Sequence, residues 1–192
     1  MSTETGTAPR TVDGHNVPAA GSYQIDPTHS SLELVVRHLV VSKVRARFTR
    51  WTADLTIAED PTQSSLNVSI DVASFQSGDD NRDGHVTGAD FFDVGSFPTA
   101  TFRSTAITPA GGDDWDVVGD LTIKDVTKPV TLSVTFAGAV TDPFGNTKSL
   151  FSAEAELDRD EWGINWNAPL ETGGVLVGKK VKLELEVQAV PA

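Results

Sequence analysis

The sequence alternates apolar and polar residues with a period of two over most of its length. The clearest stretch is VKLELEV at 181–187, where aliphatic side chains are separated by lysine and glutamate. Such alternation places one face of an extended strand in a core and the other face in water. The chain is therefore predicted to consist of half-buried β-strands.

The same alternation recurs in seven earlier segments, and turn-forming sequences such as GGDD and DPFGN separate several of them. No sustained 3.6-residue pattern and no internal repeat accompanies it. Eight antiparallel strands with one apolar face either stack as a sandwich or close as a barrel. Closure removes the sheet edges, and a barrel of eight strands is packed solid or holds one small ligand. The seven segments are 32–38, 44–57, 66–72, 100–104, 117–123, 130–136 and 151–157.

The chain has 192 residues, enough for one domain with a substantial core. Residues 1–21 are small and polar, contain several prolines and glycines, and show no periodicity. They are predicted to form a flexible N-terminal tail. The β-barrel domain is predicted to occupy residues 22–192.

Charge and composition limit the kinds of partner that the protein can have. The net charge of -12 argues against nucleic acid or an anionic membrane surface as the main partner. No run approaches the roughly 18 apolar residues of a membrane span, and the N-terminus lacks the features of a secretory signal. A cytoplasmic protein without a stable membrane span is expected. Cysteine is absent, so disulfides, thiolate metal sites and a thiol nucleophile are excluded.

A long connection at 77–98 contains the sequence GDDNRDGHVTGADFFD, which matches the spacing of an EF-hand calcium loop from Asp79 to Asp90. An EF-hand loop follows a helix, whereas the preceding LNVSIDVASF alternates as a strand. The closing position is Asp90 rather than the longer glutamate. A solvated acidic loop is therefore favoured, and a calcium-binding module stays an alternative.

Several stretches, taken in order, resemble the YceI-like family of lipocalin-shaped polyisoprenoid-binding proteins. YQIDPTHSSLELVVRH at 23–38 resembles the family's opening strand, and VRARFTRW follows with Ala46 in place of the usual glycine. RDGHVTGADFFDVGSFPTATFRS at 82–104 resembles its most specific motif, with Val86 where leucine is common. VVGDLTIKDVTKPVTLSV at 117–134 and ELDRDEWGI at 156–164 resemble the next blocks, with Trp162 at an aromatic position. The resemblance covers residue 22 to the end.

The resemblance implies an all-β fold: an eight-stranded antiparallel lipocalin-like barrel with a long connection carrying short helical segments between strands three and four. It also implies non-catalytic binding, storage or transport of a long-chain isoprenoid lipid of the quinone or prenyl pyrophosphate type. No cofactor is implied, and a homodimer stays open. Many members are exported, whereas this chain has no recognisable signal.

The candidate lining of an apolar tunnel comes from the inward-facing positions and from the phenylalanines of the long connection. Such a tunnel needs aliphatic and aromatic walls with few polar groups. A solid core needs the same residue types, so periodicity alone does not separate the two, and the resemblance favours a cavity. The candidates are Leu34, Val36, His38, Val68, Ile70, Phe91, Phe92, Phe97, Phe102, Leu121, Ile123, Leu132, Val134 and Phe136.

Four polar residues have two interpretations. Arg82, Asp83, His85 and Arg159 either meet a lipid headgroup or pair with neighbours to fix their own loops, and fixing is favoured because buried charges need partners. The histidines lack the short shared-face spacing of metal ligands, so no metal site is predicted. No nucleophile elbow or triad-like motif appears, so no enzyme is predicted. An enzyme or isomerase acting on an isoprenoid ligand is the alternative.

The calcium alternative is tested by thermal melting. We expect the melting temperature to be the same in millimolar calcium and in chelator. An ion bound only by the folded state, at 100 times its dissociation constant, would add about 2.7 kcal/mol to the free energy of unfolding. A clear rise in melting temperature with calcium would contradict the acidic-loop interpretation.

Overall fold

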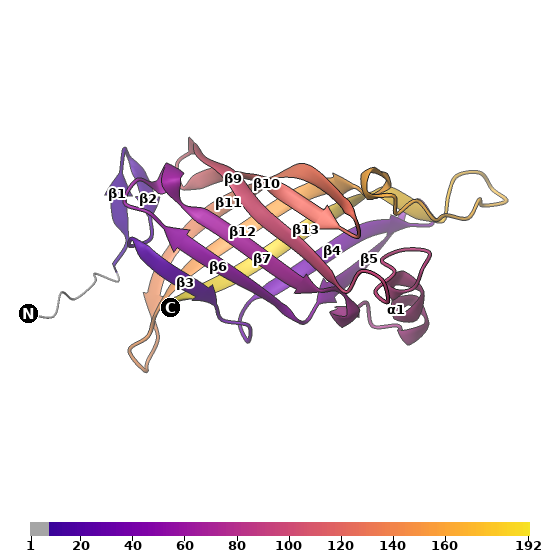
Figure 1. Cartoon of the computed structure of the whole chain (residues 1–192), viewed down its shortest axis with the longest axis horizontal. Coiled ribbons are helices and arrows are strands. Elements are labelled where there is room, and N and C mark those ends of the chain that lie inside the picture. The colour runs from indigo at the N-terminus through magenta and orange to yellow at the C-terminus, as the bar shows by residue number, and fades with distance from the viewer. Residues whose placement is uncertain (1–7) are drawn as a thin grey trace, which may run out of the picture.

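The computed structural model describes residues 8–192, and all its strands except those of a short N-terminal hairpin form one closed antiparallel barrel (Figure 1). Five strands are continuous: β9 (Thr99–Gly111), β10 (Asp114–Ile123), β11 (Val126–Thr141), β12 (Thr147–Asp158) and β13 (Val177–Pro191). Three more are interrupted and consist of β3 (Gly21–Ile25) with β4 (Ser31–His38), β5 (Ser42–Phe48) with β6 (Trp51–Ile57), and β7 (Ser65–Asp71) with β8 (Phe75–Gln76).

Each interrupted strand counts as a single strand of the barrel because its two pieces pair along the same neighbouring strand, as β7 does with β6 and β8 with β5. β3 and β4 both pair with β13, while β5 pairs with β4 and β6 pairs with β3. The ring closes where β12 pairs with β13 from Ser149 opposite Ala189 to Asp158 opposite Lys180. The predicted eight-stranded antiparallel barrel is confirmed, with each strand lying beside its neighbour in sequence.

Hydrogen bonds from polar side chains stabilise the breaks between β3 and β4 and between β7 and β8. Between β3 and β4, the Asp26 carboxylate accepts hydrogen bonds from Lys148 Nζ at 2.8 Å and His29 Nδ1 at 2.9 Å. The bond from Lys148 contributes most to lowering the pKa of Asp26 well below its ordinary value. Between β7 and β8, the buried Ser74 hydroxyl accepts from Arg50 N and donates to the Asp71 carbonyl. These side chains therefore link the segments on either side of each bend.

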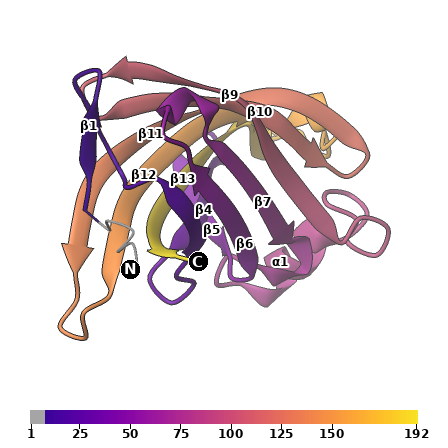
Figure 2. The ribbon, with the colours of Figure 1, turned by 60° about the vertical axis from the view of Figure 1, so that its left-hand side comes forward.

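The N-terminal segment differs from the flexible tail predicted over residues 1–21. β1 (Arg10–Val12) and β2 (His15–Val17) form a hairpin whose turn residues Asp13 and Gly14 both have positive φ. This is the geometry of a tight two-residue turn. The Val17 side chain is 2% exposed and the His15 ring packs on Trp115 at 5.5 Å. The hairpin therefore covers one end of the barrel (Figure 2), and residues 1–7 lie outside the described part.

The long connection lies between β8 and β9 and carries one α-helix rather than several short helical segments. This helix, α1 (Asp80–Thr87), begins at Asp79, whose carboxylate accepts from the Arg82 backbone N–H. Turns then lead to β9. Short 3₁₀ turns lie elsewhere, at η1 (Pro61–Gln63), η2 (Val72–Ser74) and η3 (Arg159–Trp162). Across residues 8–192, no helix has the length and apolar character to cross a membrane.

The barrel is filled most densely at its middle. The buried Phe102 ring on β9 lies directly over Gly119 of β10. A Cβ at position 119 would lie 2.4 Å from Phe102 Cζ and 2.5 Å from the Arg103 carbonyl oxygen. The absence of a side chain at Gly119 therefore allows the phenylalanine to cross the barrel interior.

Replacing Gly119 with alanine should lower the free energy of unfolding by at least about 1–3 kcal/mol, because the ring and the backbone must both shift. Urea unfolding followed by tryptophan fluorescence measures the effect. Gly95→Ala is the matched control, since a Cβ there meets nothing within 4 Å. Equal stability of the two variants would show that Phe102 does not occupy this position.

Candidate functional site

The barrel interior contains two apolar cavities, one toward each end. The α1-end cavity has a volume of about 220 Å³ and is bounded by strands, α1, η3 and the loop 163–176. The hairpin-end cavity has a volume of about 130 Å³ and is bounded by strands, η1 and the segment that follows the N-terminal hairpin. Each alone is smaller than the roughly 300–1,000 Å³ of typical small-molecule pockets. A larger ligand would therefore have to occupy both.

The α1-end cavity includes nine of the residues singled out from the sequence. They are Leu34, Val36, His38, Arg82, His85, Phe91, Phe92, Ile123 and Arg159. The sequence-based selection missed the remaining lining residues. Val44, Ala46, Leu157 and Val181 lie on strands at the apolar positions of the period-two pattern, so the sequence could have identified them as facing inward. Trp166 and Leu176 come from a loop without periodicity and gave no such signal.

The hairpin-end cavity is almost entirely apolar. Four predicted residues line it, namely Val68, Leu132, Val134 and Phe136, together with Trp51, Trp115 and Phe151, which the selection missed. Ser64 is its one hydroxyl-bearing residue. All four tryptophans of the chain line a cavity: Trp51 and Trp115 here, Trp162 and Trp166 at the α1 end.

A waist separates the two cavities. On β13, Val181 lines the α1-end cavity and Leu185 the hairpin-end cavity, whereas Leu183 lines neither. On β12, Leu157 lines the α1-end cavity, Ala153 lines the hairpin-end cavity, and Ala155 between them lines neither. On β10, the corresponding residues are Ile123, Val117 and, between them, Leu121. Three residues predicted to line the tunnel belong to this level and pack instead as buried core: Ile70, Phe102 and Leu121.

Phe97 lies away from both cavities. Its half-buried ring sits near the end of the long connection, with Lys124 Nζ 6.0 Å from the ring centroid. The two preceding phenylalanines differ from each other. Phe91 contacts Trp166 at 5.4 Å at the end of the barrel, whereas Phe92 packs against Phe48 and Phe75 at 5.8 and 6.2 Å. Phe91 therefore packs against the loop that closes the α1 end, and Phe92 packs against β5 and β8, while both rings border the α1-end cavity.

His85 forms a polar corner of the α1-end cavity. Its ring packs edge-on against Phe91 at 5.1 Å and Trp166 at 4.6 Å, and Nε2 lies 2.9 Å from an Asp90 carboxylate oxygen. The hydrogen bond fixes the ring orientation, and the two aromatic contacts hold α1 against the loop that carries Trp166. His85 thus has a clear structural role while still lining the cavity.

Arg159 fixes the loop that closes the same end. Its buried guanidinium donates to three backbone carbonyls, at Ile164 (2.7 Å), Gly178 (2.9 Å) and Val177 (3.3 Å). Burial lowers the pKa of this guanidinium, while Asp160 and Asp158 act in the opposite direction. The arginine joins η3 to both ends of the loop 163–176. This contact supports the loop-fixing interpretation of Arg159.

Asp83 also fixes its own connection and lies outside the cavity lining. It accepts hydrogen bonds from the backbone N–H and the hydroxyl of Ser77, at 2.8 and 2.6 Å. Arg82 extends from the exposed side of α1 to the cavity. The four polar residues named from the sequence are therefore brought to one end, and only Asp83 does not border the cavity.

The acidic segment does not form an EF-hand loop. Residues 80–87 are helical, and the carboxylates of Asp79, Asp83 and Asp90 accept bonds from Arg82, Ser77 and His85 respectively. An EF-hand loop instead directs these oxygens toward one ion. Within residues 8–192, no cluster of three or more histidine, aspartate or glutamate residues is placed to hold a metal ion.

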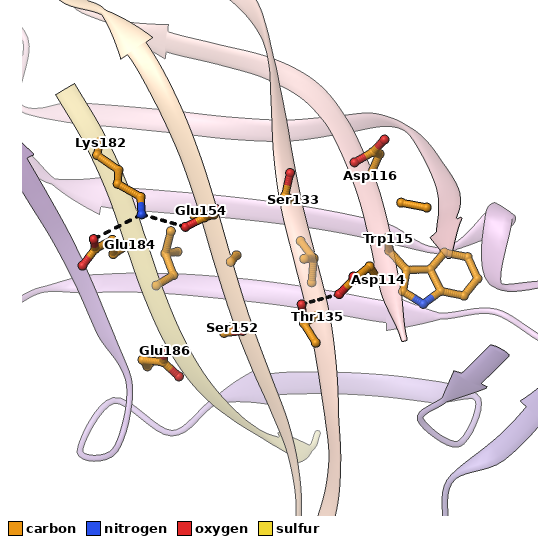
Figure 3. Close-up of a pocket in the computed structure, with 14 residues that line it drawn as sticks. Asp114, Trp115, Asp116, Ser133, Thr135, Ser152, Glu154, Lys182, Glu184 and Glu186 are labelled. Carbon is orange, nitrogen blue, oxygen red and sulfur yellow. Dashed lines mark hydrogen bonds and ion pairs between the residues drawn. The ribbon is translucent and has the colours of Figure 1, made fainter. Parts of the chain in front are cut away.

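A hollow of about 460 Å³ lies on the outer face of β10–β13 and has a different character (Figure 3). Its one cationic side chain pairs with two of its carboxylates: Lys182 Nζ lies 2.8 Å from Glu154 and 3.5 Å from Glu184. Exposed pairs of this kind contribute about 0–1 kcal/mol. The hollow is a solvated sheet surface, and the candidate site is the barrel interior.

Sequence comparison agrees with this architecture. The YceI-like domain model matches residues 23–189. The chain belongs to the YceI-like family. A UPF0312 protein of Staphylococcus aureus is 35% identical over 87% of this chain and 96% of its own length. One from Vibrio vulnificus is 36% identical over 76% of this chain and 78% of its own.

Solved YceI-like structures share the barrel. BcnA of Burkholderia cenocepacia superposes with a TM-score of 0.75 at 28% identity, over 85% of this chain and 98% of that one. A polyisoprenoid binding domain of Saccharophagus degradans superposes with a TM-score of 0.62 at 15% identity, over 88% of this chain and 98% of that one. At that identity the second likeness shows the fold alone.

Replacing Arg159 with alanine should lower the free energy of unfolding by about 3 kcal/mol, because one buried and two partly buried carbonyls lose a charged donor. Arg159→Lys should recover part of the loss, since an ammonium group cannot match the guanidinium fork. Urea unfolding measures both, with the exposed Arg103→Ala as control. Unchanged stability combined with weaker ligand binding would favour a headgroup role instead.

Proposed function

We propose that this YceI-like protein binds one long-chain isoprenoid lipid inside its barrel without acting on it chemically. The observation that carries the proposal is the polarity along the interior. The hairpin-end cavity is apolar, whereas the α1-end cavity combines an apolar wall with His38, Arg82, His85 and Arg159. A lipid with an extended apolar tail and one polar headgroup has the same distribution.

The charges at the α1 end favour an electron-rich headgroup. The lining contains two arginines and two histidines but no carboxylate, in a chain whose net charge is -12. Arginine forks match phosphate oxygens, and both arginine and histidine donate to carbonyl oxygens. A pyrophosphate or a quinone headgroup fits these donors. The proposed ligand is therefore a polyprenyl quinone or polyprenyl pyrophosphate with its headgroup at the α1 end.

The energetics require a long tail. A buried CH₂ group contributes about 0.8 kcal/mol, so a five-carbon isoprene unit contributes roughly 4 kcal/mol at best. Association costs about 4–15 kcal/mol, and micromolar affinity needs a net gain of roughly 8 kcal/mol. About three to six buried units are needed. Neither cavity alone holds such a chain, so the tail must pass the waist.

The cavity tryptophans test this arrangement. A variant with Trp162 and Trp166 replaced by phenylalanine keeps fluorescent tryptophans only at the hairpin end. A variant with Trp51 and Trp115 replaced by phenylalanine keeps them only at the α1 end. Titration with prenyl alcohols of increasing length should change α1-end emission first. Hairpin-end emission should change only with long chains, and a single-unit alcohol should not bind. Equal affinity for single-unit and long chains would contradict the proposal.

The waist provides a second test. Ala155→Leu adds volume between the two cavities at a stability cost of about 1–3 kcal/mol, while the exposed Ala106→Leu serves as the matched control. The Ala155 variant should lose at least tenfold in affinity for long chains, about 1.4 kcal/mol, whereas the much weaker binding of chains short enough for the α1-end cavity should not change. Unchanged affinity for long chains would show that the tail does not pass the waist.

A further inference from the structure

The α1 end of the barrel presents an apolar tip to solvent. Leu39, Val40 and Val41, in the turn between β4 and β5, are 46%, 58% and 79% exposed, and Val175 in the neighbouring loop is 44% exposed. These are four of the six large hydrophobic side chains that are exposed among the described residues. The loop that carries Val175 extends far from the barrel (Figure 1).

The backbone holds this tip in an unusual conformation. Leu39 and Val40 have φ values of 51° and 67°, in the left-handed region that a β-branched residue rarely occupies. A solvated turn would be more stable with glycine or asparagine at these positions. The turn is bonded to the neighbouring loop through Leu39 N and the Leu176 carbonyl at 2.9 Å. Strain retained to display apolar side chains indicates a contact surface.

Cations flank the tip. Residues 31–50 contain Arg37, Lys43, Arg45, Arg47 and Arg50 but only one acidic residue, Glu33, although the chain as a whole is strongly acidic. Arg37 and Lys43 face each other across β4 and β5 and are both exposed. Neither forms a salt bridge with another described residue. The local charge is therefore opposite in sign to the net charge.

The remaining exposed apolar residues lack this combination. Phe144 is 89% exposed at the turn between β11 and β12, near the C-terminus at the opposite end of the barrel (Figure 1). Its neighbour Asp142 is acidic and accepts from the Phe144 and Asn146 backbone N–H groups. Among the described residues, only the tip beside Arg37 and Lys43 joins exposed apolar side chains to cations without a salt bridge, the pattern of proteins that lie on anionic bilayers.

We propose that the tip, consisting of Leu39, Val40, Val41 and Val175, inserts into the headgroup region of a bilayer containing anionic lipid. Leu176, Val177 and His38 adjoin the tip and line the α1-end cavity, so docking places that cavity beside the membrane. A lipid then moves between bilayer and barrel with little exposure to water. This consequence rests on the proposed lipid-binding function, whereas docking itself is measured separately.

Acidic residues of α1 limit the docking geometry. Asp79 and Asp80 are exposed at the same end of the barrel. They favour an orientation that turns the β4–β5 turn, rather than α1, toward the anionic surface. Contact confined to a few side chains gives weak and reversible membrane binding, as a carrier requires.

Flotation with vesicles of phosphatidylcholine and phosphatidylglycerol tests the proposal. The wild-type protein should float with these vesicles, and Val40→Asn combined with Val41→Asn should bind at least about tenfold more weakly. Asparagine tolerates the left-handed conformation, so the melting temperature should not fall. Phe144→Asn, which removes the exposed ring at the other end, should bind as the wild type does.

Arg37→Gln combined with Lys43→Gln should reduce binding to the anionic vesicles and leave residual binding to pure phosphatidylcholine vesicles unchanged. Failure of the wild type to float, or equal flotation of the double-valine variant, would overturn the proposal. So would a dimer in light scattering that this variant dissociates, combined with no vesicle binding, because the tip would then join two copies.

Prenyl-alcohol titration without vesicles separates docking from lipid binding. The double-valine variant should bind the long alcohol as the wild type does, since neither valine lines a cavity. A wild type that floats but does not bind the alcohol would contradict the lipid-binding function and leave docking intact. Weaker alcohol binding by the variant would assign the two valines to the lipid site and overturn the docking role.

Discussion

The pairing of β12 with β13 closes the sheet, and the rest of the structure depends on this closure. β13 is bonded along one side to β12 and along the other to β4 and then β3. Because backbone hydrogen bonds hold the wall as a ring, the interior does not need to be packed solid to keep its shape. Two cavities therefore persist in a domain of ordinary size, separated by a waist where Phe102 crosses over Gly119.

The two ends of this ring have different chemistry. The N-terminal hairpin covers one end with apolar contacts through Val17 and Trp115. At the other end, Arg159 and His85 fix a loop and a helix around a cavity that also contains their own polar groups. Arg159 and His85 therefore stabilise the α1 end and also border its cavity. The interior is consequently polarised along its axis, although the outer surface carries a large negative charge.

Alternation of side chains was sufficient to predict the strands and the barrel, because burial of one face imposes a period of two. The N-terminal hairpin was missed even though TVDGHNV contains the Asp-Gly turn signal, since its two strands are only three residues long. Trp166 and Leu176 reach the cavity only through tertiary contacts of their loop, and no local pattern encodes those. Phe97 lies outside both cavities, and its position could not be predicted because a phenylalanine in a segment without periodicity gives no sign of the direction in which it points.

Native mass spectrometry can show whether the barrel retains a long isoprenoid lipid. The purified protein is incubated with a mixture of long polyprenyl lipids, single-unit prenyl alcohol and straight-chain fatty acid, and the retained mass is identified after extraction. We expect one long polyprenyl lipid to be retained per chain. Retention of no lipid, or of the single-unit alcohol as readily as the long chain, would contradict it.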